Sequence, residues 1–405
     1  MIACSLDSML IIKRQSIDDF GLTPVEEKLP YLYWNIKLHK YGERFIAGGT
    51  ELVITEASKL LDKTLKLVCD TLRAHDAVFM KKHGVRRFWV IDSSDVVAKF
   101  VRKWPFKLSK SRALFSFDFE KMYTKLPHPD LIEKIALAVR EALDIEEASI
   151  IEVSDNGAFY RKHGTTSHAG GIHFMDASEI ENLLTFVISN TYLHNGDFLV
   201  RQILGIPMGT NSGPKIANLY LYWYESNFID RLLQNKDFSI AQEFHISFRL
   251  IDDLLSISNP AIVDFVAVPY PLGIYPKELS LKRTNASCSE ADFAGLLLRD
   301  QNEMIITALF DKRRAFPFPV VRNQHPSSTI PSSVIYGVYT SQLHRFAVAC
   351  TLFVDFKTEA LDYRDYLVEK DYSLRRLNRL LAKFFIKHGV PLYKRSLSSL
   401  LRPGT

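Results

Sequence analysis

The feature of this chain that most constrains its fold is a pair of adjacent aspartates between two apolar runs, in FRLIDDLLSISNP at residues 248–260. The apolar runs predict two buried strands, with Asp252 and Asp253 at the tip of the hairpin that joins them. Neighbouring carboxylates repel each other, and holding them in a low-dielectric site is costly unless a cation neutralises them. A solvated hairpin tip and one half of a two-metal site both fit this stretch.

A third carboxylate lies on a strand far upstream. The segment RALFSFDFEKMY at residues 112–123 alternates with period two, so its Phe side chains share one face and Asp118 lies on the other. On its own, Asp118 fits a surface position on an edge strand. Nucleotidyl transfer, however, needs carboxylates that converge from separate strands on two hard cations ~3.5–4 Å apart. Asp118 and the aspartate pair supply such a set.

Composition excludes several classes of protein. Hydrophobic residues make up 47% and charged residues 24% of the 405 residues, which is typical of globular rather than disordered chains. The four cysteines are scattered without a C-x-x-C pair, so we interpret them as reduced thiols. No apolar run approaches the ~20 residues of a membrane span or forms a signal peptide. We expect a protein of the nucleus or cytoplasm that is not secreted and has no membrane partner.

Hydrophobic periodicity predicts a mixed α+β fold with a helical C-terminal end. A hairpin or long loop is expected between residues 150 and 177, and Ser178 and Glu181 have the spacing of a capping box. Beyond Phe310 the pattern predicts a loop, a helix, a second loop and a last helix. The predicted helices cover residues 55–82, 93–104, 129–144, 178–193, 215–233 and 372–389.

At this point the chain resembles a known family, the reverse transcriptases, and most closely those of Penelope-like retroelements and related animal transposable-element proteins. The similarity runs from about Leu29 to about Ser396. Its strength lies in the order and spacing of the segments together. The segments that carry it are LPYLYWNIKLHK with RFIA after it, SFDFEKMYTKLPH, VRQILGIPMGTNSGPKIANLYL, FRLIDDLLSI, YPKELSLKRTN and ALFDKRRAFPF.

The resemblance implies a right-hand polymerase fold of fingers, palm and thumb. Residues 1–110 would form the N-terminal and fingers region, 111–305 the palm with a fingers insertion at about 130–200, and 306–405 a basic, helical thumb-like region. The implied activity is RNA-directed DNA polymerisation, in which a DNA or RNA primer is extended on an RNA template with dNTPs. Two Mg²⁺ ions, or Mn²⁺ in their place, would be the cofactors.

The resemblance also implies roles for single residues. The metal ligands would be the carboxylates of Asp118, Asp252 and Asp253 with the backbone carbonyl of Phe119. Lys282 would lie near the leaving pyrophosphate, with Arg283 as the alternative.

Further residues would bind the nucleotide and the nucleic acid. The ring of Tyr123 would leave no room for a 2′-hydroxyl and so favour deoxynucleotides. Lys40 and Arg44 would grip the triphosphate. Gly205 and Gly209, on either side of Met208, would let the backbone approach the templating base pair. An acid-free tail from Tyr372 to Thr405 would follow the duplex phosphates. Its nucleic-acid-binding residues would be Arg375, Arg376, Arg379, Lys383 and Lys387.

Three positions depart from the family pattern. Met208 and Leu250 replace a usual Gln and Tyr, and Gly295 stands where an Asp is expected in the primer-holding turn. These departures keep a second hypothesis open, a non-catalytic or repurposed nucleic-acid-binding relic. A third, an RNA-dependent RNA polymerase, is disfavoured by Tyr123. The start just upstream of the fingers and the short end after LRPGT suggest a fragment or a reduced element.

Overall fold

The computed structural model describes residues 2–3, 7–22, 29–37, 42–47, 52–103, 112–301, 303–316, 318, 320 and 322–401. These residues divide into two compact units, each assembled from three stretches of the chain. Unit 1 contains Met1–Val90, Asp118–Asp252 and Ala261–Lys282, and unit 2 contains Ile91–Phe117, Asp253–Pro260 and Arg283–Thr405. The expected division into fingers, palm and thumb by residue range stays a prediction.

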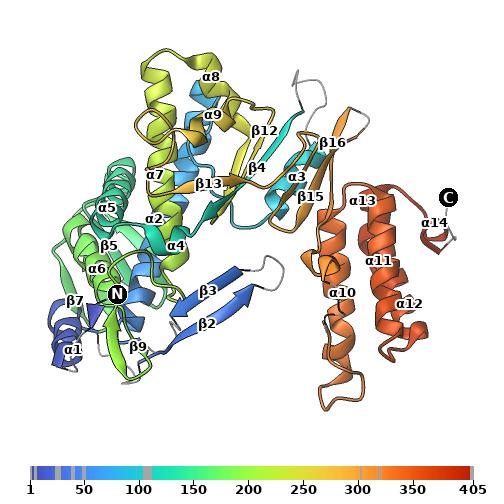
Figure 1. Cartoon of the computed structure of the whole chain (residues 1–405), viewed down its shortest axis with the longest axis horizontal. Helices are drawn as coiled ribbons and strands as arrows, with labels where there is room; N and C mark the ends of the chain where they lie inside the picture. Colours follow the sequence, from blue (N-terminus) through green and yellow to red (C-terminus); the bar gives the residue numbers. More distant parts are fainter. Residues whose placement is uncertain are drawn as a thin grey trace. The chain divides into compact units, whose positions relative to one another are not determined.

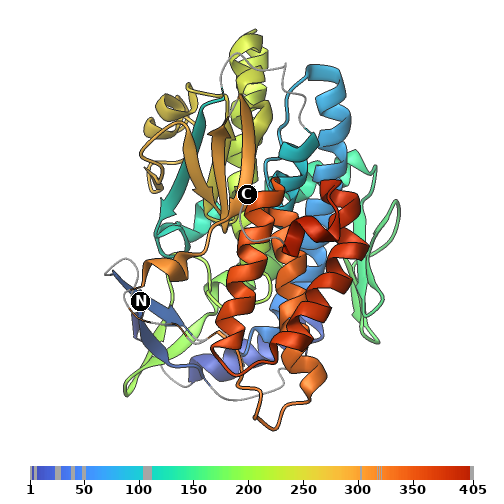
Figure 2. The same cartoon turned by 90° about the vertical axis from the view of Figure 1, so that its right-hand side faces the viewer.

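Long helices form the framework of unit 1 (Figures 1 and 2). Helix α2 (Thr55–His83) buries a stripe of Leu and Val side chains and ends at Gly84, whose backbone is left-handed. Its neighbours α5, α6 and α7 pack against it. Shorter helices lie before, between and after these in the chain. Apart from α2, the helices of unit 1 are α1 (Asp7–Phe20), α4 (Met122–Lys125), α5 (His128–Ile145), α6 (Ala177–Ser189), α7 (Gly213–Gln234), α8 (Phe238–Glu243) and α9 (Ile262–Ala267).

Among the described residues, three small sheets lie wholly within unit 1. Strands β2 (Leu32–Lys37) and β3 (Gly42–Ala47) form an antiparallel hairpin. A second sheet has the order β1-β10-β9, and a third has the order β6-β5-β8-β7. The bounds in these two sheets are β1 (Ile2–Ala3), β5 (Ile150–Ser154), β6 (Gly157–Arg161), β7 (Ser167–Ala169), β8 (Ile172–Met175), β9 (Tyr192–Asn195) and β10 (Phe198–Arg201).

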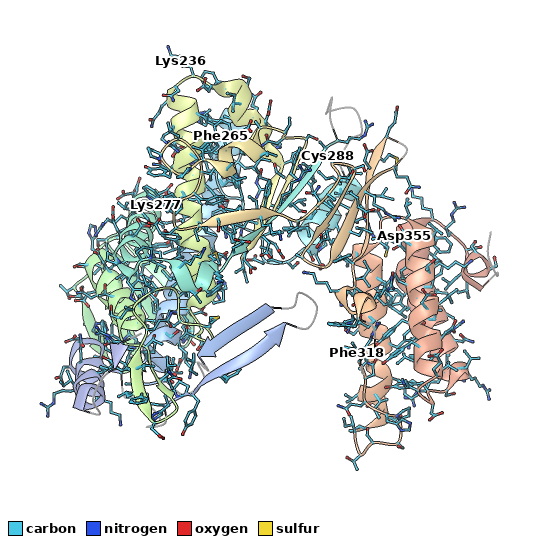
Figure 3. The ribbon with its side chains drawn as sticks, in the orientation of Figure 1. Lys236, Phe265, Lys277, Cys288, Phe318 and Asp355 are labelled. Carbon is cyan, nitrogen blue, oxygen red and sulfur yellow. The ribbon has the colours of Figure 1, made fainter. Side chains whose placement is uncertain are left out.

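Aromatic side chains fill the core at one end of α7. Phe228 packs edge-on against Phe244 and Phe265, with ring centroids 5.0 and 4.9 Å apart (Figure 3 labels Phe265). Trp89 stacks on Phe244 at 5.7 Å. Such rings bury large apolar areas, so this cluster fixes the end of α7 against the segment that leads into the double-aspartate hairpin.

Unit 2 combines a three-stranded antiparallel sheet with a bundle of helices. The sheet has the order β14-β15-β16, and α3 and α10 pack against β16. Helices α10, α11 and α12 pack against one another (Figure 1). Asp355, in the first turn of α11, accepts a hydrogen bond from Arg299 on β15 at 3.0 Å. The bounds are α3 (Asp95–Lys103), β14 (Glu290–Phe293), β15 (Leu296–Gln301), β16 (Met304–Leu309), α10 (Ser332–Ala349), α11 (Phe353–Val368), α12 (Leu374–Phe384), α13 (Val390–Tyr393) and α14 (Leu397–Leu401).

A four-stranded sheet with the order β11-β12-β4-β13 carries the predicted carboxylates. Its strands are β4 (Leu114–Glu120), β11 (Ser247–Leu250), β12 (Asp253–Ile257) and β13 (Ser280–Arg283). Phe115, Phe117 and Phe119 are buried in β4, whereas Asp118 is half-buried. The strands on both sides of the aspartate pair are confirmed. The predicted alternation in β4 holds only at Asp118 and Glu120, because Leu114 and Ser116 on the same face are buried as well.

The mixed α+β fold class is confirmed, and so are the helices that correspond to α2, α3, α5 and α7. The capping box at Ser178 is wrong, because α6 begins at Ala177 and the Asp176 side chain accepts from the Glu179 amide at 2.9 Å. Among the described residues after Phe310 there are three helices of more than ten residues, α10 to α12, where two helices were predicted. Within the described residues, no helix is long and apolar enough to cross a membrane.

Candidate active site

The end of β4 lies beside the turn that follows β11. The Phe119 amide donates to the Asp252 carbonyl oxygen at 3.1 Å. Strands paired in this way run about 4.8 Å apart, so the backbones next to Asp118 and at Asp252 are direct neighbours. Both aspartates are half-buried in unit 1, and Asp253 follows as the first residue of β12. The sequence prediction that these segments converge therefore has a geometric basis.

Two left-handed residues shape the backbone on either side of this contact. Ile251 has φ +56° in the turn before Asp252, and Lys121 has φ +56° directly after β4. The left-handed conformation costs a non-glycine residue about 1–2 kcal/mol, so other contacts must hold both turns. At Ile251 the carbonyl oxygen accepts a hydrogen bond from Arg249 at 3.2 Å.

Tyr123 lies in α4, four residues after Phe119, and its side chain is half-buried. Burial, and next to it the charge of Asp252, raise the pKa of Tyr123 to about 12. The phenol is therefore protonated at neutral pH and lies within electrostatic reach of the Asp252 carboxylate. The ring of Tyr123 therefore lies near Asp252, and its predicted role toward the sugar stays a prediction.

Gly205 joins the GIPMG loop to the backbone of Tyr123. The Gly205 amide donates to the Leu126 carbonyl at 2.7 Å, and the Ile206 amide donates to the Tyr123 carbonyl at 2.9 Å. At Gly205 φ is +83°, and a Cβ atom would lie 2.1 Å from the Tyr123 carbonyl oxygen. The close approach that this glycine permits is thus to the chain's own backbone at Tyr123.

The rest of the loop is more open. Met208 is half-buried, and Gly209 is exposed with φ +86°. The loop ends at Ser212, whose amide donates to the buried Ser58 hydroxyl of α2 at 3.1 Å. This contact fixes the start of α7, while the Met208–Gly209 segment stays accessible.

The structure describes most, but not all, of the cations predicted to contact the triphosphate or the pyrophosphate. Lys282 is exposed on β13. Its alternative, Arg283, packs over the ring of Phe115 at 5.1 Å and is the less accessible cation. Arg44 lies on β3 opposite Asn35, and Lys40 lies outside the described residues.

On α12 and the π-helical turn after it, four of the five predicted cations form one stripe. Arg375, Arg379, Lys383 and Lys387 are exposed and recur every four residues, so they share one helical face. We call these four residues the basic stripe. Arg376 lies off it, with its guanidinium 3.9 Å from the Tyr336 ring centroid and its Nη1 2.6 Å from the Ser332 hydroxyl. Arg376 therefore contributes to packing within unit 2.

The unusual Gly295 has a local structural reason. Phe293 pairs with Leu296, which leaves Ala294 and Gly295 as the two turn residues, with φ +48° and +84°. Positive φ at both positions defines a type I′ hairpin, for which Gly, Asn and Asp are favoured. Glycine in place of aspartate therefore suits this turn. At the other departure, Leu250 is the half-buried last residue of β11.

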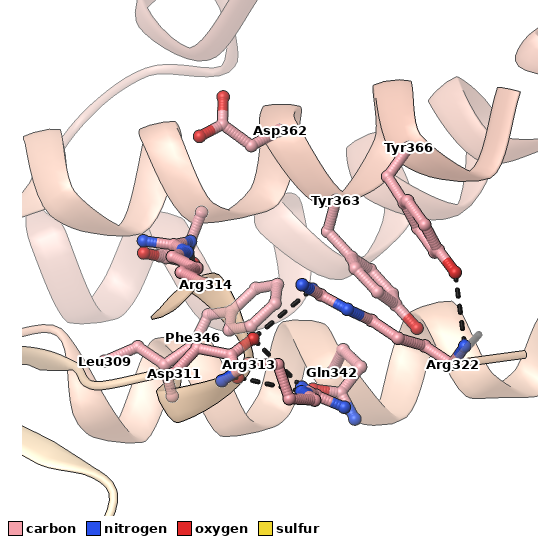
Figure 4. A pocket seen from close by; sticks show the side chains of 11 residues that line it. Leu309, Asp311, Arg313, Arg314, Arg322, Gln342, Phe346, Asp362, Tyr363 and Tyr366 are labelled. Atoms are coloured by element: carbon pink, nitrogen blue, oxygen red, sulfur yellow. Dashed lines mark hydrogen bonds and ion pairs between the residues drawn. The ribbon is translucent and has the colours of Figure 1, made fainter. Parts of the chain in front are cut away.

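A cavity of about 200 Å³ in unit 2 lies under the ALFDKRRAFPF segment (Figure 4). Arg313 and Arg322 line it, and both pair with Asp311, at 2.8 and 3.3 Å. Burial alone would raise the pKa of Asp311, but the hydrogen bonds from Arg313 hold it below its usual value. Arg314 pairs with Glu359 at 2.6 Å. Carboxylates compensate these guanidinium charges. We therefore interpret the cavity as a packing feature of unit 2 and not as a ligand site.

The donor set of the site is made of oxygens. Within the described part of the chain, no group of three or more His, Cys, Asp or Glu side chains is placed to hold a metal ion. Mg²⁺ in polymerase sites needs only one or two carboxylates, because substrate phosphates and water complete its shell. Asp118, Asp252 and the Phe119 carbonyl offer oxygen donors of this type, and their role as metal ligands stays a prediction.

Sequence reasoning missed a buried ionic network beside this site. Arg249 on β11 and Glu225 on α7 form an ion pair with 0% exposure of both side chains. Each charge lies within a largely apolar run, Arg249 in FRLI and Glu225 in LYLYWYESNFI. Because buried charges must be paired, opposite charges in two apolar runs were a usable signal.

Comparisons with known proteins identify the fold. No protein-family model matches the chain, and no curated protein matches it. Among solved structures, the chain is similar to telomerase from Candida albicans in complex with a TWJ fragment of telomeric RNA, with 11% identity and a TM-score of 0.60. This match covers 99% of the present chain and 64% of the telomerase chain.

Two further structures are more distant. Apo telomerase from Candida tropicalis has 14% identity and a TM-score of 0.47, with 96% of this chain and 68% of that chain covered. The BmCPV RNA-dependent RNA polymerase in its elongation state has 10% identity and a TM-score of 0.43, with 82% and 26% covered. The likeness to the Candida albicans protein shows the fold, which is the right-hand polymerase fold with its mixed helices and sheets.

Proposed function

We propose that this chain is an RNA-directed DNA polymerase of a retroelement, of the Penelope-like kind, that extends a DNA or RNA primer on an RNA template. The observation that carries the proposal is the hydrogen bond from the Phe119 amide to the Asp252 carbonyl. It joins the segments of Asp118 and Asp252, and the contacts of Tyr123 and Gly205 connect to it the segments that would face the nucleotide. The fold supports this function.

Each residue of the site would have a defined task. The Asp118 and Asp252 carboxylates, with Asp253 next to them and the Phe119 carbonyl, would hold Mg²⁺ or Mn²⁺. A bound divalent ion would lower the pKa of the primer hydroxyl and neutralise charge on the phosphates. The half-buried Tyr123 ring would occupy the space that a ribose 2′-hydroxyl needs. Exposed Lys282 would accompany the leaving pyrophosphate, and the basic stripe would follow the duplex backbone.

Primer extension tests the proposal. Oligo(dT) annealed to poly(rA) is incubated with dTTP and either Mg²⁺ or Mn²⁺, and incorporation by the wild type is compared with that of Asp252→Asn, Asp253→Asn. We expect synthesis by the wild type and none above background by this double variant. The matched control is Asp155→Asn, Asp197→Asn, which removes two exposed carboxylates of unit 1 and should leave synthesis unchanged.

The same assay separates the alternatives. A folded wild type that binds the primer–template but incorporates nothing with either ion would contradict the polymerase and favour a nucleic-acid-binding relic. A preference for rUTP over dTTP would favour an RNA polymerase. If the Tyr123 ring is the sugar gate, Tyr123→Ala should raise rUTP use relative to dTTP by about tenfold or more.

A further inference from the structure

Arg249 is a completely buried cation whose hydrogen-bonding capacity is fully used. A guanidinium has five N–H donors in a fixed planar arrangement. The Nε group donates to Glu225 Oε1 at 2.5 Å, and Nη2 donates to Glu225 Oε2 at 3.1 Å and to the Asn218 carbonyl at 3.0 Å. The Nη1 group donates to Asn218 Oδ1 at 3.0 Å and to the Ile251 carbonyl at 3.2 Å. The side chain thus links α7 to the turn before Asp252.

A second branch of this network reaches the strand of Asp118. The Tyr275 hydroxyl donates to Glu225 Oε1 at 2.9 Å and is buried. The ring of Tyr275 packs edge-on against Phe119, with ring centroids 4.8 Å apart. Phe119 in turn donates its amide to the Asp252 carbonyl. The buried residues therefore contact both backbone segments that carry the candidate ligands.

Stability alone is a weak reason for such a network. A buried ion pair often contributes no more than an apolar pair of the same size, because removing two charges from water is costly. The specific gain here is geometric. Ile251 has a left-handed backbone at φ +56°, and the guanidinium supplies a directed donor to its carbonyl. A Lys side chain keeps the charge but lacks the planar five-donor arrangement.

We propose that Arg249, oriented by Glu225, is a positioning residue that fixes the Ile251–Asp252 turn and thereby the alignment of Asp252 with Phe119 and Asp118. Its catalytic consequence rests on the proposed polymerase function. In that function Arg249 touches neither substrate nor metal. It holds the backbone from which the Asp252 carboxylate projects.

The test replaces the pair and measures order and activity separately. In Arg249→Met, Glu225→Met both charges are lost at similar volume, so the fold should survive. We expect faster amide hydrogen exchange in the peptides covering residues 114–120 and 247–257, with unchanged primer–template affinity. The maximal incorporation rate should fall about 10- to 100-fold, and the Mg²⁺ concentration for half-maximal rate should rise. Arg249→Lys retains the charge and serves as the second variant if the double variant does not fold. It should show the same changes in exchange and in rate.

The matched control is Arg161→Gln, Glu152→Gln, which removes a partly exposed ion pair of the same unit, 2.7 Å apart. It should leave exchange in both peptides and the incorporation rate at wild-type values. Unchanged exchange and rate in the folded Arg249 variants would overturn the positioning role. If the wild type incorporates nothing, the polymerase proposal fails, and the exchange of the 247–257 peptide in the Arg249 variants still decides the positioning role.

Discussion

At Gly205, one missing Cβ atom decides whether two segments of the site can meet. A Cβ there would lie 2.1 Å from the Tyr123 carbonyl oxygen, a distance that backbone atoms cannot relieve by a rotamer change. Gly196 makes a natural comparison. Its φ is also positive, +60°, but no described atom lies within 4 Å of its Cβ position. The two glycines therefore separate the cost of a left-handed backbone from the cost of a steric clash.

Gly205→Ala should destabilise the folded state by about 3 kcal/mol or more, because it adds a clash to the left-handed strain. Gly196→Ala should cost only about 1 kcal/mol, which is the strain alone. Denaturant unfolding of both variants measures the difference. Primer extension at a temperature where each is folded should be impaired only in Gly205→Ala, since the shift is transmitted to Tyr123. Equal stabilities of the two variants would show that the Gly205 contact is relaxed in solution.

At the scale of elements, α12 combines a buried apolar face with an exposed basic face. Leu377, Leu381 and Phe384 are buried within unit 2, whereas the basic stripe is exposed. Like charges at a spacing of four residues destabilise an isolated helix by a few tenths of a kcal/mol for each pair. A polyanion that lies along the stripe would remove this repulsion, and its counterions would be released on binding.

Neutralising two residues of the stripe tests this interpretation. Arg379→Gln, Lys383→Gln should weaken binding to a primer–template and lower the slope of log affinity against log salt by about two. Lys81→Gln, Lys82→Gln removes two exposed charges at the end of α2 and is the control. A salt slope equal to that of the wild type in the α12 variant, or a matching decrease in the control, would rule out a specific role for the stripe.

The elements also mark the limit of what the sequence could predict. The periodicity of α2, α7 and β4 is strong and local, so those elements were predicted. The cap of α6 was not, because Asp176 lies two residues before the capping-box pattern and competes with it for the same helix start. The short strands between residues 150 and 175 have mixed burial and give no clear alternation. Two of their pairings, β5 with β6 and β7 with β8, are tight hairpins, in agreement with the hairpin expected in this region. The pairing of β5 with β8 joins the two hairpins and was not predicted.

The candidate site shows the same boundary. Aspartates at a strand and a hairpin are recognisable by residue type, and so is a Gly/Pro-rich loop. The contacts that order them, such as Gly205 with Tyr123 and Arg249 with Glu225, join segments separated by tens of residues. Arg376 illustrates the converse, because its residue type suggested phosphate binding and its position places it on Tyr336. Residue type predicts the chemistry available, and tertiary packing decides which groups are free to perform it.

Across both units, buried and half-buried tyrosines make the folded state sensitive to alkaline pH. Burial raises the pKa of Tyr123 and Tyr160 to about 12 in unit 1. Burial likewise raises the pKa of Tyr339 and Tyr393 in unit 2. An unfolded chain would ionise these phenols near pH 10. The folded protein thus binds more protons than the unfolded chain above that pH, and its free energy of unfolding must fall as pH rises.

We expect the denaturant midpoint to be steady from neutral pH to about pH 9 and to fall progressively between about pH 10 and 12, where the unfolded and folded pKa values lie. Tyrosinate absorbance should develop later in the native protein than in the denatured chain, which separates this effect from lysine deprotonation. Tyr339→Phe removes one buried phenol, whose hydroxyl donates to the Ala360 carbonyl at 3.0 Å. It should lower stability at neutral pH by about 1 kcal/mol and flatten the alkaline decline. Tyrosinate absorbance that rises together in both states would contradict the buried-phenol explanation, because protonated phenols in the folded state are its premise.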